Sequence, residues 1–75
     1  MKGHWVSREE ADRIKKRYPA GTRLILDYMD DPYCPVPCGI HGTVEHVDDQ
    51  GQLHMKWDNG RTLALIPGVD HFHRE

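Results

Sequence analysis

The residues with the clearest chemical potential lie in one short stretch, CPVPCGIHG. It holds the two cysteines of the chain, Cys34 and Cys38, with His41 three residues further on. Thiolate and imidazole groups are the ligands of structural zinc sites, and Cys-x3-Cys falls within their usual spacing. A fourth ligand would have to come from a distant histidine, because no second paired motif is present. A zinc-stapled module is therefore one hypothesis for this stretch.

The prolines inside the stretch oppose that hypothesis. Pro35 and Pro37 favour an extended polyproline course, in which four residue steps span roughly 12 Å. Two sulfurs on one zinc lie within about 4 Å of each other, so a turn at Val36-Pro37 would be needed. A disulfide has a similar requirement, and a reducing cytoplasm disfavours it. We expect ordinary loop cysteines and no cofactor, with zinc and a disulfide as alternatives.

Catalytic chemistry has no support elsewhere in the sequence. The chain lacks a nucleophile elbow, a phosphate-cradling glycine loop and an HExxH motif. Its aspartates fall in expected turns, where the side chain bonds nearby backbone N–H groups. The chain has 75 residues, of which 37% are hydrophobic and 29% charged, a composition typical of one small globular domain. We therefore expect a protein that is not an enzyme.

Charge is distributed unevenly along the chain. Residues 1–17 hold six Lys or Arg against three acidic residues, whereas residues 18–75 hold four against nine. The basic end, Lys15, Lys16 and Arg17, is a candidate for association with nucleic acid, although the rest of the chain is acidic. No apolar run is long enough to span a membrane, and the MKGHWVSREE start has no signal-like apolar stretch. These features predict a cytoplasmic protein without a membrane partner.

A helix and five short strands must position these residues. Ser7 followed by Glu10 is a capping-box pattern, and Pro19 with Gly21 ends the helical pattern, which predicts a helix over residues 8–17. Beyond it the period changes to two. Leu24, Leu26 and Tyr28 share one face of a strand. The expected strands are TRLILDY, GTVEHV, QLHMKW, RTLALI and a brief one in PGVDHF.

The turns between these strands indicate an arrangement. Asn59-Gly60 predicts a type I′ hairpin turn, and DDQG a second tight turn. One long first loop followed by two tight hairpins is the order of a five-stranded SH3-like barrel, which we expect over residues 20–75. Residues 1–19 would form a capping helix and linker. The apolar contacts of that helix would come from Trp5, Ile14 and Tyr18.

The motifs GTR, DDPY, PVP, GTV, VDDQGQLH, WDNG and LIPGVD occur in this order between Tyr18 and Phe72. As a set they resemble the bacterial and phage family known as domain of unknown function 4314. The resemblance implies a small β-barrel module and brings no assigned activity. It also implies Ala and Pro where this chain has Cys34 and Cys38, so the cysteines are particular to this chain.

A long loop with an aromatic residue beside a hairpin tryptophan is how small barrels build a binding groove. We therefore expect a non-catalytic module, a monomer or weak homodimer, that binds a protein or peptide. Strand alternation also allows Trp57 a core position, and Tyr33 could fold over the core as a lid. The expected partner-binding residues are Asp30, Asp31, Tyr33, Pro35 and Trp57.

Overall fold

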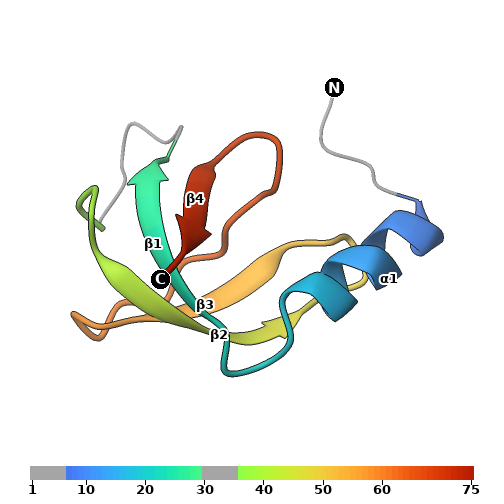
Figure 1. Cartoon of the computed structure of the whole chain (residues 1–75), viewed down its shortest axis with the longest axis horizontal. Helices are drawn as coiled ribbons and strands as arrows, with labels where there is room; N and C mark the ends of the chain where they lie inside the picture. Colours follow the sequence, from blue (N-terminus) through green and yellow to red (C-terminus); the bar gives the residue numbers. More distant parts are fainter. Residues whose placement is uncertain (1–6, 30–35) are drawn as a thin grey trace.

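A computed structural model describes residues 7–29 and 36–75. These residues form one helix and one antiparallel sheet, in which the strands lie in the order β3-β2-β1-β4 (Figure 1). The sheet does not close on itself. The elements are α1 (Arg8–Arg17), β1 (Arg23–Tyr28), β2 (His41–Val47), β3 (Leu53–Trp57) and β4 (His71–Arg74). The predicted helix and the mainly β class are confirmed.

Helix α1 begins and ends as its sequence dictates. The Ser7 side chain accepts a hydrogen bond from the backbone N–H of Glu10 at 3.1 Å, which satisfies one free donor of the first turn. At the other end, the N–H of Tyr18 donates to the carbonyl of Ile14. Ala11 is buried, while Ile14 and Tyr18 pack against the core. Trp5, expected to join them, lies outside the described residues.

The core lies on one face of the sheet, as the period-two pattern predicts. Leu53, Met55 and Trp57 of β3 are each at most 1% exposed, and Leu24 and Leu26 of β1 are fully buried. Removing this apolar surface from water is the main force that holds the sheet in shape. Other buried core residues are Met29, Val36, Val44 and Leu65.

Tyr28 departs from the predicted pattern. It was expected to share the buried face of Leu24 and Leu26, but its side chain is 53% exposed. The pairing of β1 with β4 shifts register between Leu26 and Tyr28, so that Tyr28 lies opposite His71. Such an irregularity turns the following side chain out of its expected face. The core position predicted for Tyr28 is therefore wrong.

The segment expected as a fourth strand, residues 61–66, meets β3 only at two isolated bridges, Lys56 with Thr62 and Leu53 with Leu65. In that register Leu63 would face Met55 between the bridges. Its carbonyl instead accepts a hydrogen bond from the indole Nε1 of Trp57 at 3.1 Å. This interaction holds the segment out of a regular ladder, so the described residues form four strands rather than five. The sheet of the described residues is open, and it does not form the closed five-stranded barrel that was predicted.

The turn at residues 58–60 also differs from the type I′ prediction. Only Gly60 has a positive φ, 87°, and its N–H donates to the carbonyl of Trp57 at 2.9 Å. The N–H of Trp57 donates to the carbonyl of Arg61 at 2.8 Å. This pattern is that of a three-residue hairpin loop whose last residue is left-handed, the role in which glycine is favoured.

Candidate functional site

Four of the five residues predicted to bind a partner lie outside the residues that the structure describes: Asp30, Asp31, Tyr33 and Pro35. Cys34, considered as a zinc ligand, lies outside them as well, and these roles stay predictions. Trp57, the remaining member, is 1% exposed and fixed by its bond to Leu63. A buried indole cannot meet a partner, so the core position that strand alternation predicted for Trp57 is confirmed.

Two of the three residues considered as zinc ligands, Cys38 and His41, lie in the described part of the chain. Cys38 is a free, exposed cysteine. The imidazole Nδ1 of His41 lies 2.6 Å from the Glu75 carboxylate. Within residues 7–29 and 36–75, no group of three or more His, Cys, Asp or Glu side chains is arranged to hold a metal ion. The contribution of Cys34 to such a site is a prediction that these residues do not address.

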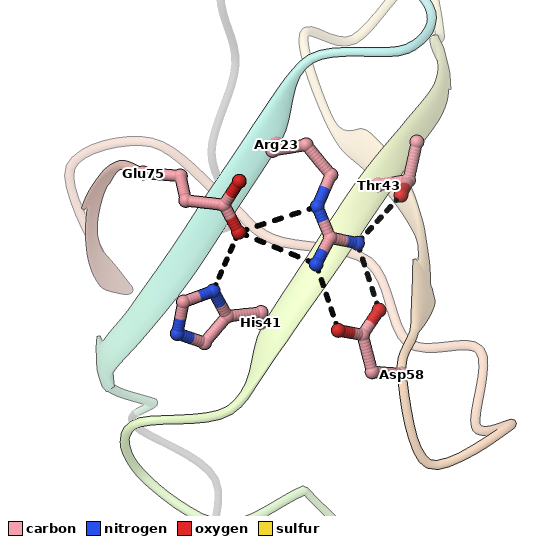
Figure 2. A network of polar contacts seen from close by, with 5 residues as sticks. All are labelled: Arg23, His41, Thr43, Asp58 and Glu75. Atoms are coloured by element: carbon pink, nitrogen blue, oxygen red, sulfur yellow. Dashed lines mark hydrogen bonds and ion pairs between the residues drawn. The ribbon is translucent and has the colours of Figure 1, made fainter.

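A polar network surrounds Arg23 on β1 (Figure 2). The guanidinium makes two 2.8 Å bonds to the Asp58 carboxylate and one of 3.0 Å to the Thr43 hydroxyl. Its Nε and Nη2 atoms each lie 3.3 Å from Glu75 Oε2, which also contacts His41. The network therefore ties β1, β2, the 58–60 turn and the residue after β4 together.

The electrostatics of this network are those of a structural clamp. The hydrogen bond from Arg23 lowers the pKa of Asp58, and bonds from His41 and then Arg23 lower the pKa of Glu75. The hydrogen bonds that Arg23 donates to Asp58 and Glu75 raise its own pKa further above its ordinary value. Arg23 donates four hydrogen bonds to these partners, and its Nη2 makes an ion-pair contact with Glu75. The guanidinium is therefore engaged within the network.

A second polar cluster serves the β2–β3 hairpin. Asp48 Oδ1 accepts the backbone N–H groups of Gln50 and Gln52, each at 2.9 Å, and Asp48 Oδ2 lies 2.9 Å from His54 Nε2. Partial burial would raise the pKa of Asp48, but these hydrogen bonds outweigh it and lower the pKa. The His54 ring stacks on His46 with centroids 4.3 Å apart. The cluster braces the turn, as expected of a turn aspartate.

The cations in the last two turns of α1 divide into two groups. Lys15 pairs with Asp49 at 2.8 Å, and their mutual hydrogen bond raises the pKa of Lys15 and lowers that of Asp49. Arg13, Lys16 and Arg17, by contrast, have no ion-pair partner among residues 7–29 and 36–75. Unlike Arg23 and Lys15, these three cations remain available to a ligand.

The three free cations line a groove, which we call the α1 groove. It has a volume of about 520 Å³ and lies between α1 and the turn at residues 67–68. Figure 1 shows α1 to one side of the sheet. Its lining residues are Glu10, Arg13, Ile14, Lys16, Arg17, Tyr18, Pro67 and Gly68.

The aromatic wall of the α1 groove is held in place from two sides. Tyr18 packs edge-on against Phe72 of β4, with ring centroids 5.6 Å apart. The Arg74 guanidinium lies 5.0 Å from the centre of the Tyr18 ring and also donates a hydrogen bond to the carbonyl of Arg17. These contacts join the last turn of α1 to β4 and fix the shape of the groove.

Sequence reasoning found part of this site. It singled out Lys16 and Arg17 as candidate ligand contacts, and both line the groove, whereas Lys15 is neutralised by Asp49. It missed Arg13, although residues four apart on a helix share a face and Arg13 precedes Arg17 by four. The opposite wall, Pro67 and Gly68, comes from a distant turn that helical spacing cannot predict.

The fold and the groove define a small, mainly β domain whose N-terminal helix packs against an open antiparallel sheet. None of the helices in the described residues is long and apolar enough to cross a bilayer. The chain belongs to the family described as Domain of unknown function (DUF4314), whose model matches residues 7–74. The match includes α1 together with the sheet. No curated protein and no solved structure gives a significant match.

Proposed function

We propose that this chain is a non-catalytic module that recognises a protein or peptide segment, and that the α1 groove is its binding site. The observation that carries the proposal is the combination of apolar walls, from Ile14, Tyr18 and Pro67, with the unpaired cations of α1. Binding sites commonly join such an apolar lining to a few polar groups that fix orientation. A cytoplasmic location, as monomer or weak homodimer, is part of the same proposal.

The wider architecture supports an interaction module. The bridges from residues 61–66 to β3 extend the strand order toward that of a five-stranded SH3-like barrel, and we include that arrangement in the proposal. Domains of this type bind extended segments in surface grooves. The loop at residues 30–37, with Tyr33, stays a second predicted contact of the partner.

Panning a random peptide display library against the full chain tests the proposal. Glu10→Trp places an indole at the rim of the α1 groove, whereas Glu9→Trp adds the same group to a neighbouring exposed position that does not line it. Peptides enriched on the wild type should bind the Glu9→Trp protein normally and the Glu10→Trp protein at least about tenfold more weakly, a difference of about 1.4 kcal/mol.

Two results would contradict the proposal. One is a library from which the wild type enriches no peptide. The other is a set of enriched peptides that bind the Glu10→Trp and Glu9→Trp proteins equally well, which would place the binding surface elsewhere. Circular dichroism of both variants checks that each retains the fold.

A further inference from the structure

The lining of the α1 groove carries an excess of positive charge. This lining contains three basic side chains, those of Arg13, Lys16 and Arg17, and a single carboxylate, that of Glu10. Arg74, whose guanidinium lies over the Tyr18 ring, adds a further cation to the same region. The remainder of the chain, residues 18–75, has four basic residues against nine acidic ones. The charge of the groove is therefore opposite to that of the body on which it lies.

Contacts within the chain hold the walls of the α1 groove in place. In its turn wall, Asp70 Oδ2 accepts the N–H of Ile66 at 2.8 Å, and the Ile66 carbonyl accepts the N–H groups of Val69 and Asp70. Gly68, at φ 90°, presents no side chain, and a Cβ placed there would meet nothing within 4 Å. Tyr18 is fixed by Phe72 and Arg74. A preformed site loses little conformational entropy on binding, which favours affinity for a short segment.

The small number of cations and the acidic body favour a peptide over a nucleic acid. Arg13 and Arg17 are separated by four helical residues, about 6 Å along the helix axis. In an extended peptide, side chains at alternate positions share a face and lie about 6.6 Å apart, so two carboxylates at such positions match the two arginines. Duplex DNA, in contrast, carries one negative charge for about every 1.7 Å of its axis, counted over both strands, and its binding proteins draw affinity from contacts with many phosphates. Arg13 and Arg17 can pair with only about two phosphates, and the acidic body of the chain repels the neighbouring ones.

We infer that the α1 groove takes a short acidic peptide segment of another protein. Two carboxylates at alternate positions pair with Arg13 and Arg17, and a neighbouring apolar residue packs on Tyr18 and Pro67. This inference rests on the proposed function, because it assigns a chemistry to the partner of the same groove. Lys16, on the same helix, strengthens the attraction for the acidic segment without a fixed pairing.

Fluorescence anisotropy with synthetic probes tests the inference on the full chain. The main probe is a labelled peptide with Glu at alternate positions on both sides of a Trp, and its partner probe replaces every Glu by Gln. A labelled single-stranded oligonucleotide of equal charge is the third. The wild type should bind the Glu peptide at least about tenfold more tightly than the Gln peptide and the oligonucleotide.

A charge-reversal pair locates the binding. Arg13→Glu with Arg17→Glu should weaken binding of the Glu peptide at least about tenfold. The matched control, Lys56→Glu with Arg61→Glu, makes the same change of net charge at exposed positions that do not line the groove, and should bind as the wild type does. Arg13→Gln with Arg17→Gln, a milder change, should give an intermediate loss. The comparison of Glu and Gln peptides needs only the wild type and does not depend on how any variant folds.

Several outcomes would overturn the inference. Equal binding of the Glu and Gln peptides would remove the role of carboxylates, and equal loss in both charge-reversal proteins would remove the role of the groove. Tighter binding of the oligonucleotide, abolished by reversal at Arg13 and Arg17, would assign the groove to nucleic acid. A dimer in sedimentation that the same reversal dissociates would assign it to a second copy of the chain. If library peptides sensitive to Glu10→Trp lack acidic residues, the inference fails while the proposed function stands; if neither library peptides nor the Glu peptide binds, both fail.

Discussion

Gly42 lies directly opposite Trp57 in the β2–β3 ladder, and its missing side chain makes room for the indole. A Cβ at this position would lie 2.5 Å from Cε3 of Trp57 and 3.0 Å from Cζ3. Ordinary contact begins near 3.4 Å, so the ring would have to move by about 0.9 Å (3.4 − 2.5). Gly42→Ala therefore tests how tightly this core is packed.

The indole has little freedom to move. Trp57 is 1% exposed and belongs to the buried core cluster. Overpacking of this kind typically destabilises a core by about 1–3 kcal/mol. Displacement of the ring also strains the Nε1 bond to Leu63, and a hydrogen bond contributes about 1 kcal/mol. Alanine also reduces the conformational freedom of the unfolded chain, which by itself stabilises the folded state by about 0.4–1 kcal/mol. We expect Gly42→Ala to lower the free energy of unfolding by about 1–3 kcal/mol.

Urea unfolding followed by circular dichroism measures this loss, and thermal melting should show a decrease of about 4–8 °C for each kcal/mol. Glu45→Ala, at an exposed position of the same strand, is the control and should stay within about 0.5 kcal/mol of the wild type. The cause is tested by adding Trp57→Phe, because phenylalanine lacks the fused ring that contains Cε3 and Cζ3. In that background Gly42→Ala should be at least about 1 kcal/mol less destabilising.

Two results would refute this reasoning. A Gly42→Ala protein as stable as the wild type would mean that the indole is not confined. A Gly42→Ala loss that is unchanged by Trp57→Phe would mean that the contact with the ring is not the cause.

Three further predictions follow from local contacts. Ser7→Ala removes the helix cap and should reduce the free energy of unfolding by about 0.5–2 kcal/mol in urea titrations, whereas no change would show that the cap is dispensable. The lowered pKa values of Asp58 and Glu75 add stability above their unfolded values of 3.8 and 4.5, and that stability is lost as the pH falls through the lower folded values. Urea midpoints should therefore fall more steeply from about pH 5 to about pH 3 in the wild type than in Arg23→Met. Parallel profiles in the two proteins would show that Arg23 does not stabilise the ionised carboxylates. Asp70→Ala should lower the free energy of unfolding by about 1–3 kcal/mol, because it leaves a half-buried backbone N–H without its acceptor, and a melting temperature equal to the wild type would show that another group replaces it.

The parts of the fold that the sequence predicts are those encoded locally. Ser7 and the basic last turn define α1, because capping and the helix dipole act within one turn. Leu53, Met55 and Trp57 alternate along β3 because a strand places every second side chain on one face. The glycines of the hairpins mark positions of positive φ, such as Gly60.

The parts that the sequence does not predict depend on contacts between distant residues. Tyr28 turns outward because β1 shifts register against β4, which lies far along the chain. Leu63 leaves the expected ladder because its carbonyl meets the Trp57 indole. The α1 groove needs Pro67 as its second wall. Composition and spacing identify the cations of α1, but only the fold separates the neutralised Lys15 from the unpaired Arg17.

The position of β1 between β2 and β4 also sets an order of assembly. A short turn joins β2 to β3, whereas β4 must return from the far end of the chain to pair with β1. Closing a longer loop costs more conformational entropy, so distant pairing follows local pairing during folding. The β2–β3 hairpin should form first and β4 should dock last. Since Phe72 and Arg74 of β4 hold Tyr18, the α1 groove takes its final shape only in this last step, and local opening of β4 would loosen it before the core unfolds.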